Sequence, residues 1–164
     1  KDVKESDWFY EAVRYCNTQK ILSGTGDDSF TPQASTTRAM FVMALAQLMK
    51  ADLDSYSGKA EFDDVQAGAW YAPAVGIQRR VQRAPGICQP KLAAFIHRLP
   101  RYKDASASSE EFPDADKISD WAYESVQVMR QCGVISGMGD GSFAPKAMLN
   151  RAQLAVIFMQ VHKG

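Results

Sequence analysis

Two parts of this chain, 113 residues apart, follow one pattern without a gap. The matching segments are residues 7–13 and 120–126 (DWFYEAV and DWAYESV), 21–32 and 134–145 (ILSGTGDDSFTP and VISGMGDGSFAP), and 37–39 and 150–152 (TRA and NRA). Chance does not produce so long a match. The chain is therefore built from repeats, and repeats of this kind bury their apolar faces against one another.

A third, shorter copy lies between these two. Its first part, residues 62–65 (FDDV), is followed by Trp70 at the spacing that separates Val3 from Trp8, and its last part is the apolar segment 92–99. Polar residues typical of turns and linkers separate the copies. We expect three repeats and two linkers: repeats 1–51, 62–102 and 112–164, and linkers 52–59 and 103–109.

Each repeat is predicted to fold as a helix, a glycine-rich loop and a second helix, so the expected fold class is all-α. Apolar residues of the first helices fall on one face at helical spacing: Trp8, Val13 and Cys16 in repeat 1, and Trp121, Val126 and Met129 in repeat 3. Asp7 and Asp120 suit an N-cap or first-turn position, where a carboxylate meets free N–H groups. Gly24 and Gly137 are expected to follow the ends of these helices, since glycine permits left-handed backbone there.

The second helices are apolar on nearly every side. We expect them over residues 38–49, 91–99 and 151–161, with Thr36 or Thr37 capping the first and Asn150 capping the third. A helix without a polar face is buried all round. Three such helices satisfy one another in a bundle, so the predicted architecture is a pseudo-threefold trimer of helix-loop-helix repeats around a central three-helix bundle.

Composition excludes several classes of function. The formal net charge is zero, with 19 basic and 19 acidic residues, so a nucleic-acid binder is not indicated. No apolar run approaches the ~20 residues that cross a bilayer, and membrane insertion is not expected. His97 and His162 have no nucleophile or metal ligand at a useful spacing, so we expect no catalysis, no metal and no cofactor. The glycine-rich loops lack the closing Glu of an EF-hand and the Gly-Lys-Ser/Thr of a phosphate loop, which favours a structural turn.

The three cysteines, Cys16, Cys88 and Cys132, are an odd number and do not have zinc-binding spacing. Free cysteine is among the most often buried residues. We therefore predict that all three are small buried apolar side chains.

Together, the motifs resemble the S-layer homology (SLH) domain family, whose signature combines Phe-x-Asp-Val, Trp-x-Tyr-x-x-Val, Gly-Asp-Gly-x-Phe-x-Pro and Thr-Arg-Ala-Glu. Repeat 3 matches this signature over nearly its whole length, repeat 1 nearly as well, and repeat 2 only at its two ends. The resemblance implies an extracellular module at the bacterial cell wall or S-layer, which holds a larger exported protein non-covalently. The implied partner is a secondary cell-wall polysaccharide, often pyruvylated, bound in grooves between repeats; other S-layer subunits are further candidate partners.

In this family the arginine of Thr-Arg-Ala-Glu is a main ligand contact, a role implied here for Arg38 and Arg151. A guanidinium group matches the carboxylate of a pyruvylated sugar with two parallel hydrogen bonds, and a helix start also favours an anion. Tryptophan offers a flat apolar face to a sugar ring. The candidate ligand-binding residues are Arg38, Arg151, Thr37, Trp8, Trp70, Trp121, Asp64 and Asp114.

Other interpretations of these residues stay open. An arginine at an interface between repeats is often structural, tryptophans belong more often to the core, and Asp2, Asp64 and Asp114 are also suited to capping loops or helices. The alternative function is a structural protein–protein interaction module of a surface lattice, without glycan binding. A fragment of a hydrolase is a third and weaker hypothesis.

Repeat 2 departs from the signature. It lacks the Gly-Asp-Gly-x-Phe-x-Pro loop, and Gln89 stands at the arginine position. We therefore expect residues 78–91 to be irregular and the corresponding groove to lack an arginine. The acidic fourth residue of Thr-Arg-Ala-Glu is also replaced, by Met40 in repeat 1 and by Gln153 in repeat 3.

Overall fold

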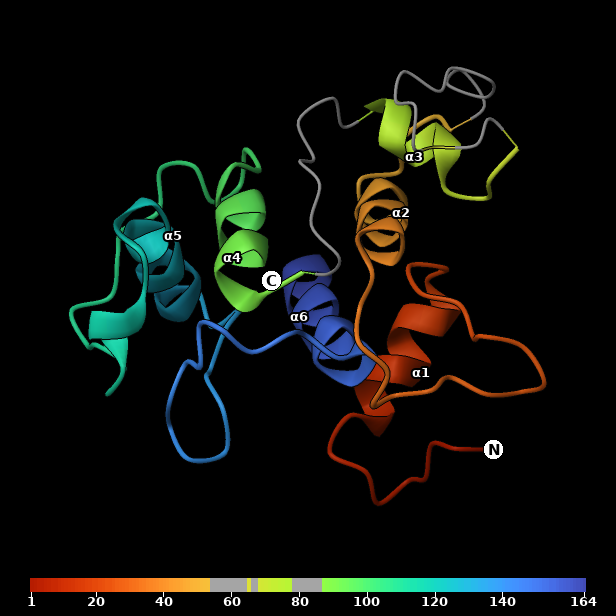
Figure 1. The fold of residues 1–164 in the computed structure, drawn as a ribbon, viewed down its shortest axis with the longest axis horizontal. Helices are drawn as coiled ribbons and strands as arrows, with labels where there is room; N and C mark the ends of the chain where they lie inside the picture. Colours follow the sequence, from red (N-terminus) through yellow and green to blue (C-terminus); the bar gives the residue numbers. More distant parts are fainter. Residues whose placement is uncertain (54–64, 66–67, 78–86) are drawn as a thin grey trace. The chain divides into compact units, whose positions relative to one another are not determined.

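The computed structural model describes residues 1–53, 65, 68–77 and 87–164, and these residues form helices and loops without a strand. The helices, shown in Figure 1, are α1 (Tyr10–Thr18), α2 (Arg38–Leu48), α3 (Ala72–Ile77), α4 (Gln89–His97), α5 (Asp120–Gln131) and α6 (Arg151–Lys163), with a 3₁₀ turn at Ala115–Lys117. The all-α prediction is confirmed. None of the helices in the described part of the chain is long and apolar enough to span a bilayer.

The second helices of repeats 1 and 3 begin at the predicted positions, α2 at Arg38 and α6 at Arg151. α4 begins at Gln89, two residues before the predicted start at residue 91, so the glutamine does stand where the other repeats have arginine. The expectation that residues 78–91 are irregular is wrong at its C-terminal end, because α4 already includes residues 89–91. Residues 78–86 lie outside the described residues.

The caps of α2 and α6 follow the prediction. The Thr37 hydroxyl accepts a hydrogen bond from the Met40 N–H at 3.2 Å. At α6, Asn150 Oδ1 accepts the Gln153 N–H at 2.8 Å, and Gln153 Oε1 accepts the Asn150 N–H at 3.1 Å. This reciprocal pair is a capping box. Glutamine therefore supplies at α6 the return bond that the missing glutamate of the family motif would make, whereas Met40 has no oxygen with which to make it at α2.

The predicted role of Gly24 and Gly137 at the ends of the first helices is wrong. α1 ends at Thr18 and α5 at Gln131, and the left-handed residue after each helix is Lys20 (φ +57°) or Gly133 (φ +68°). Gly137 is nevertheless left-handed (φ +86°), as predicted for it, and close approach also requires glycine at positions 24 and 137. An added Cβ would lie 2.8 Å from the main-chain oxygen on the opposite side of the loop, which is closer than real Cβ contacts.

Each second helix contacts the first helix of the repeat that follows it in the chain, and the second helix of repeat 3 contacts the first helix of repeat 1. α2 contacts α3, and α4 contacts α5, where His97 Nδ1 lies 3.0 Å from the Ser125 hydroxyl. α6 contacts α1, where the Cys16 thiol donates to the Ala155 carbonyl at 3.3 Å. Each of these helix pairs therefore joins two different repeats.

Contacts divide the chain into two compact units, one holding α1, α2, α3 and α6 and the other holding α4 and α5. In the first unit, the buried rings of Phe41 on α2 and Phe158 on α6 lie 5.9 Å apart. The apolar second helices are therefore buried, as predicted. A central bundle that also includes α4 stays a prediction, and so do the repeat boundaries, since each compact unit combines elements of more than one repeat.

Candidate functional site

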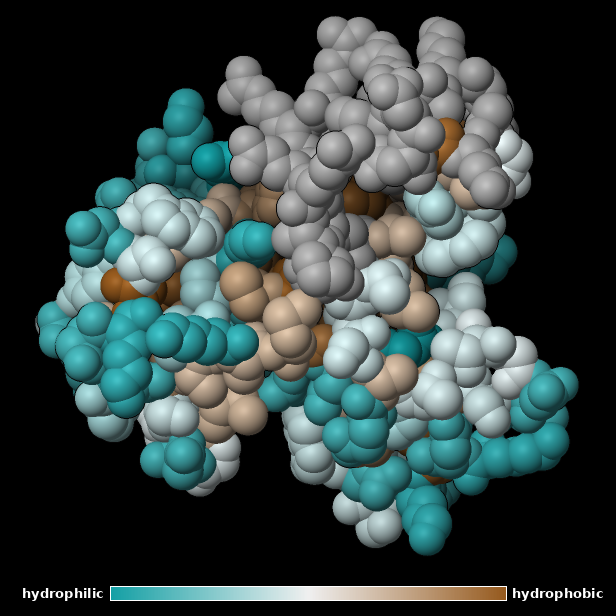
Figure 2. Space-filling view, viewed as in Figure 1, coloured by the Kyte–Doolittle hydropathy of each residue, from teal (hydrophilic) through white to brown (hydrophobic). Residues whose placement is uncertain are grey.

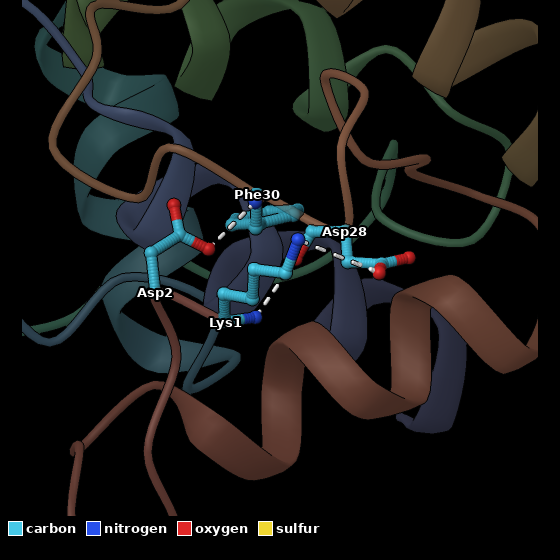
Figure 3. Close-up of polar contacts among 4 residues, drawn as sticks. All are labelled: Lys1, Asp2, Asp28 and Phe30. Carbon is cyan, nitrogen blue, oxygen red and sulfur yellow. Dashed lines mark hydrogen bonds and ion pairs between the residues drawn. The ribbon is translucent and has the colours of Figure 1, made fainter.

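The glycine-rich loop of repeat 1 is fastened to the first residues of that repeat by Asp2. Its two carboxylate oxygens accept the N–H groups of Phe30 at 2.8 Å and Thr31 at 2.6 Å, and Figure 3 shows the bond to Phe30. The Phe30 N–H lowers the pKa of Asp2, because the bond favours the ionised carboxylate. Thr31 is left-handed (φ +52°), an uncommon conformation for a branched residue, and the bond to Asp2 holds it there.

Asp114 makes the same contacts in repeat 3. Its oxygens accept the N–H groups of Phe143 and Ala144, both at 2.8 Å, and Ala144 is left-handed at φ +52°. Burial by itself would raise the pKa of Asp114, but the two N–H groups outweigh burial and lower it. Among the open interpretations of Asp2 and Asp114, the geometry supports the loop-capping one.

Arg151, at the start of α6, reaches into the loop of repeat 1. Its Nε donates to the Phe30 carbonyl at 2.6 Å and one terminal nitrogen donates to the Ser23 carbonyl at 2.7 Å. The other terminal nitrogen lies 3.6 Å from the Met40 sulfur, and the guanidinium carbon lies 4.4 Å from the centroid of the Phe30 ring. Arg151 is only 3% exposed, and burial lowers its pKa, partly offset by the Asp2 carboxylate.

Three contacts therefore hold Phe30 in place. The Asp2 carboxylate accepts its N–H, Arg151 donates to its carbonyl, and the guanidinium group lies over its ring. The first N–H groups of α6 are also used: those of Arg151 and Ala152 donate to the carbonyls of Ala34 and Pro32, both at 3.0 Å. The first two N–H groups of α6 are thus already bonded to the loop of repeat 1.

Gln89 takes the equivalent place at α4, where it meets the loop of repeat 3. It is 5% exposed, and its side-chain nitrogen lies 3.5 Å from the Met138 sulfur. That the corresponding groove lacks an arginine stays a prediction, because residues 78–86 lie outside the described residues. The pattern is the same as at α6: the first residue of a second helix contacts the loop of a different repeat.

All three tryptophans are exposed, in contrast to the apolar helical face predicted for Trp8 and Trp121. Their exposed fractions are 67% for Trp8, 60% for Trp70 and 60% for Trp121. Trp8 lies before the first residue of α1, so helical spacing does not apply to it, and Trp121 points outward from the first turn of α5. The remaining residues of that face are buried as predicted: Val13, Cys16, Val126 and Met129. The core interpretation of the tryptophans is therefore wrong.

Of the other predicted site residues, Thr37 is the N-cap of α2. Asp64 and the Arg38 side chain lie outside the described residues. Asp120 occupies the first turn of α5 as predicted, whereas Asp7 precedes α1 and its carboxylate accepts the Lys4 N–H at 2.8 Å.

The cysteine prediction holds for only one residue. Cys16 is buried, and burial raises its pKa to about 12. Cys88 is half-buried and Cys132 is exposed, so the prediction that these two are buried is wrong. Cys132 immediately follows the last residue of α5, where a helix end meets solvent.

An open groove of about 690 Å³ lies in repeat 1 between α1 and the loop, with Tyr10, Asn17 and Phe30 among its lining residues. In repeat 3 the ring of Phe112 lies 5.3 Å from the Phe143 ring.

Sequence reasoning missed the specific partners of Arg151 and Asp2. The repeat itself contains a signal: aspartate, phenylalanine and arginine recur in the same order in repeats 1 and 3, with 28 residues from Asp2 to Phe30 and 29 from Asp114 to Phe143. That recurrence indicates that the three act together, but it does not say which carbonyl or N–H group each one meets.

Comparison with known proteins places these features in a family. The family model of the S-layer homology domain matches residues 1–40 and 111–155, just over half of the chain, and the second repeat lies between the two matched segments. An amylopullulanase of Thermoanaerobacterium thermosulfurigenes is 29% identical over 95% of this chain and 9% of its own length. Exoglucanase XynX of Acetivibrio thermocellus is 28% identical over 95% of this chain and 15% of its own length. The surface-layer 125 kDa protein of Lysinibacillus sphaericus is 24% identical over 94% and 14%, so this chain spans less than a fifth of each relative.

Proposed function

Since the chain belongs to the S-layer homology domain family, a family of non-catalytic cell-wall anchoring modules at the bacterial surface, we propose that it attaches a larger exported protein to a secondary cell-wall polysaccharide. The attachment is non-covalent and is made by side chains that the fold leaves facing solvent. The relatives named as amylopullulanase and exoglucanase carry the similar region as a small part of a long chain, which suits an anchor joined to a separate functional region.

The observation that carries this proposal is the exposed tryptophan in every repeat. Repeat 2 lacks the glycine-rich loop and the arginine, yet it retains Trp70 with 60% of its surface exposed. A large aromatic side chain that contributes little to the core is typical of a binding surface. Indole faces suit the apolar C–H faces of sugar rings.

The zero net charge of the chain favours a saccharide partner over a strongly charged partner such as nucleic acid. The chain has as many basic as acidic residues, and hydrophilic residues gather on the outer parts of the face shown in Figure 2. A polymer bound through stacking and a few hydrogen bonds needs no extended basic surface, unlike nucleic acid.

The test is co-sedimentation of the module with purified cell-wall sacculi, before and after acid extraction of the secondary polymer. We expect binding to native sacculi and its loss after extraction. Replacing Trp8, Trp70 or Trp121 by alanine is expected to weaken binding about 5- to 30-fold, since a stacked aromatic contributes roughly 1–2 kcal/mol. Met49, 54% exposed, is the matched control, and Met49→Ala should leave binding unchanged.

Two outcomes would contradict the proposal. Equal binding to extracted sacculi would show that the secondary polymer is not the ligand. Self-association or binding to purified S-layer protein, with none to native sacculi, would favour the lattice-contact alternative.

A further inference from the structure

We infer that the open groove of repeat 1 is a docking site for an extended peptide segment of a second polypeptide, in which acidic residues are followed by an aromatic residue. The groove lies between α1 and the glycine-rich loop. In repeat 3 the counterparts of its lining residues are contacted by residues 108–112 of this chain, which have that chemistry. The inference adds a protein partner to the saccharide partner of the proposed function.

The offset of 113 residues pairs the lining of the groove with a covered surface in repeat 3. Arg14 is exposed, whereas its counterpart Gln127 is only 2% exposed, and Asn17 is exposed, whereas its counterpart Arg130 is half-buried. The same positions of the first helix are therefore open to solvent in repeat 1 and covered in repeat 3. The other paired residues are Tyr10 and Tyr123, Val13 and Val126, Gly24 and Gly137, and Phe30 and Phe143.

The aromatic residue of the covering segment is its apolar anchor. The Phe112 ring lies 5.3 Å from the Phe143 ring and 4.3 Å from the guanidinium carbon of Arg130, and it would lie 2.9 Å from a Cβ added to Gly137. All three neighbours are counterparts of residues that line the groove, and Phe112 is 3% exposed. Among the described residues, the only atoms within 4 Å of a Cβ added to Gly24 belong to its own loop. An aromatic ring placed in the groove would therefore meet the surface that Phe112 meets in repeat 3.

The acidic residues of the covering segment make polar contacts with α5. The Tyr123 hydroxyl donates to the Glu111 carboxylate, and a terminal nitrogen of Arg130 lies 3.2 Å from a Glu110 oxygen. In repeat 1, Tyr10 supplies the same hydroxyl at the edge of the groove, and a neutral asparagine stands in place of the arginine. The groove thus retains one of the two donors for a carboxylate.

A main-chain contact indicates a peptide rather than a sugar. The Ser108 N–H donates to the Gln127 carbonyl at 3.1 Å, which fixes the covering segment as an extended strand along the helix. The counterpart of that acceptor, the Arg14 carbonyl, accepts the exposed Thr18 hydroxyl at 2.9 Å, and a peptide N–H can share or replace this bond because a carbonyl has two lone pairs. Since residues 108–112 are engaged on repeat 3, the occupant of the groove comes from another polypeptide.

The test is a nuclear magnetic resonance titration of the isotope-labelled module with the capped peptide Ser-Ser-Glu-Glu-Phe, beside Ser-Ser-Glu-Glu-Ala. We expect saturable binding of one phenylalanine peptide per chain, with shifts centred on main-chain signals of the groove such as Gly24, Gly26 and Ser29. The alanine peptide should bind about 10- to 100-fold more weakly, because the buried ring carries most of the apolar contact.

Variants of the groove identify the contacts. Asn17→Arg installs the arginine of repeat 3 and should strengthen binding about 3- to 10-fold, through a cation over the ring and a partner for glutamate. Gln19→Arg adds the same charge at an exposed position outside the lining and should leave binding unchanged. Tyr10→Phe should weaken binding about 2- to 5-fold, and this loss should disappear with the peptide Ser-Ser-Gln-Gln-Phe, which has no carboxylate to accept the hydroxyl.

Several results would overturn the inference. They are equal binding of the phenylalanine and alanine peptides, shifts that avoid the groove, no binding at millimolar peptide, and equal gains in Asn17→Arg and Gln19→Arg. Displacement of the peptide by a fragment of the secondary polymer would also overturn it, since the groove would then be a saccharide site. Co-sedimentation with sacculi is a separate measurement, so loss of the proposed function and loss of the peptide site are distinguishable.

Discussion

Replacing Asp114 by alanine removes the acceptor of two main-chain N–H groups that hold the loop of repeat 3. Phe143 and Ala144 each donate to this carboxylate at 2.8 Å, and Phe143 is fully buried. A hydrogen bond to a charged group contributes about 1.5–3 kcal/mol, and a buried N–H left without an acceptor adds a cost. Removing the carboxylate also removes the free-energy cost of burying it. We therefore expect a net loss of about 2–4 kcal/mol of unfolding free energy.

For a domain of this size, 1 kcal/mol corresponds to about 2–4 °C in melting temperature, so Asp114→Ala should melt about 5–15 °C below the wild type. Asp114→Asn retains one acceptor oxygen and should lose about half as much. Asp116, exposed and two residues away, is the matched control, and Asp116→Ala should change the unfolding free energy by less than about 0.5 kcal/mol. Chemical and thermal unfolding followed by circular dichroism measure all three variants.

The pH dependence provides a second check. The pKa of Asp114 is lower in the folded protein than in the unfolded chain, so its contribution is complete above the unfolded value and is lost as pH falls through the folded value. The difference in unfolding free energy between wild type and Asp114→Ala should therefore be constant from pH 7 to 5 and shrink in acid. A well-folded alanine variant as stable as the wild type at pH 7, or a difference that grows in acid, would refute this account of the loop.

Three further predictions concern single positions in repeats 1 and 3. Lys20 is left-handed where repeat 3 has Gly133, so Lys20→Gly should raise the unfolding free energy by about 0.5–1 kcal/mol in a urea titration. Gly24→Ala should lower the melting temperature by several degrees in a thermal scan, because its Cβ would lie 2.8 Å from a main-chain oxygen; an unchanged melt would show that the loop yields freely. In native protein, iodoacetamide should modify the exposed Cys132 but not the buried Cys16, whose pKa of about 12 keeps it protonated, with mass spectrometry after denaturation as the positive control.

Features set by neighbouring residues could be predicted from the sequence. The starts of α2 and α6 are encoded by Thr37 and Asn150, whose side chains cap the helix a few residues away, and by the apolar run that follows. The same holds for the buried face of the first helices, where the helical period correctly places Val13 and Cys16 inside. These signals act over one or two helical turns, so the pattern alone is enough to identify them.

Features set by distant partners could not be predicted. The acceptors of Arg151 lie 121 and 128 residues earlier in the chain, so its motif is compatible with an open ligand site and with a closed contact alike. The helical period misplaces Trp8 for a different reason: an indole is apolar enough to suggest burial, but α1 begins only at Tyr10, so the period does not apply to residue 8. Exposure depends on what packs opposite a side chain, which hydrophobicity does not specify.

The hydrogen bonds from Arg151 to the loop of repeat 1 also have a consequence for folding during synthesis. The loop around Phe30 is among the first parts of the module to be made, but the arginine that holds its carbonyl is made 121 residues later. Contacts between residues so far apart in the chain form slowly, because a long segment must be closed before they contribute. The loop of the first repeat can therefore make its contacts with Arg151 only after the third repeat has been made.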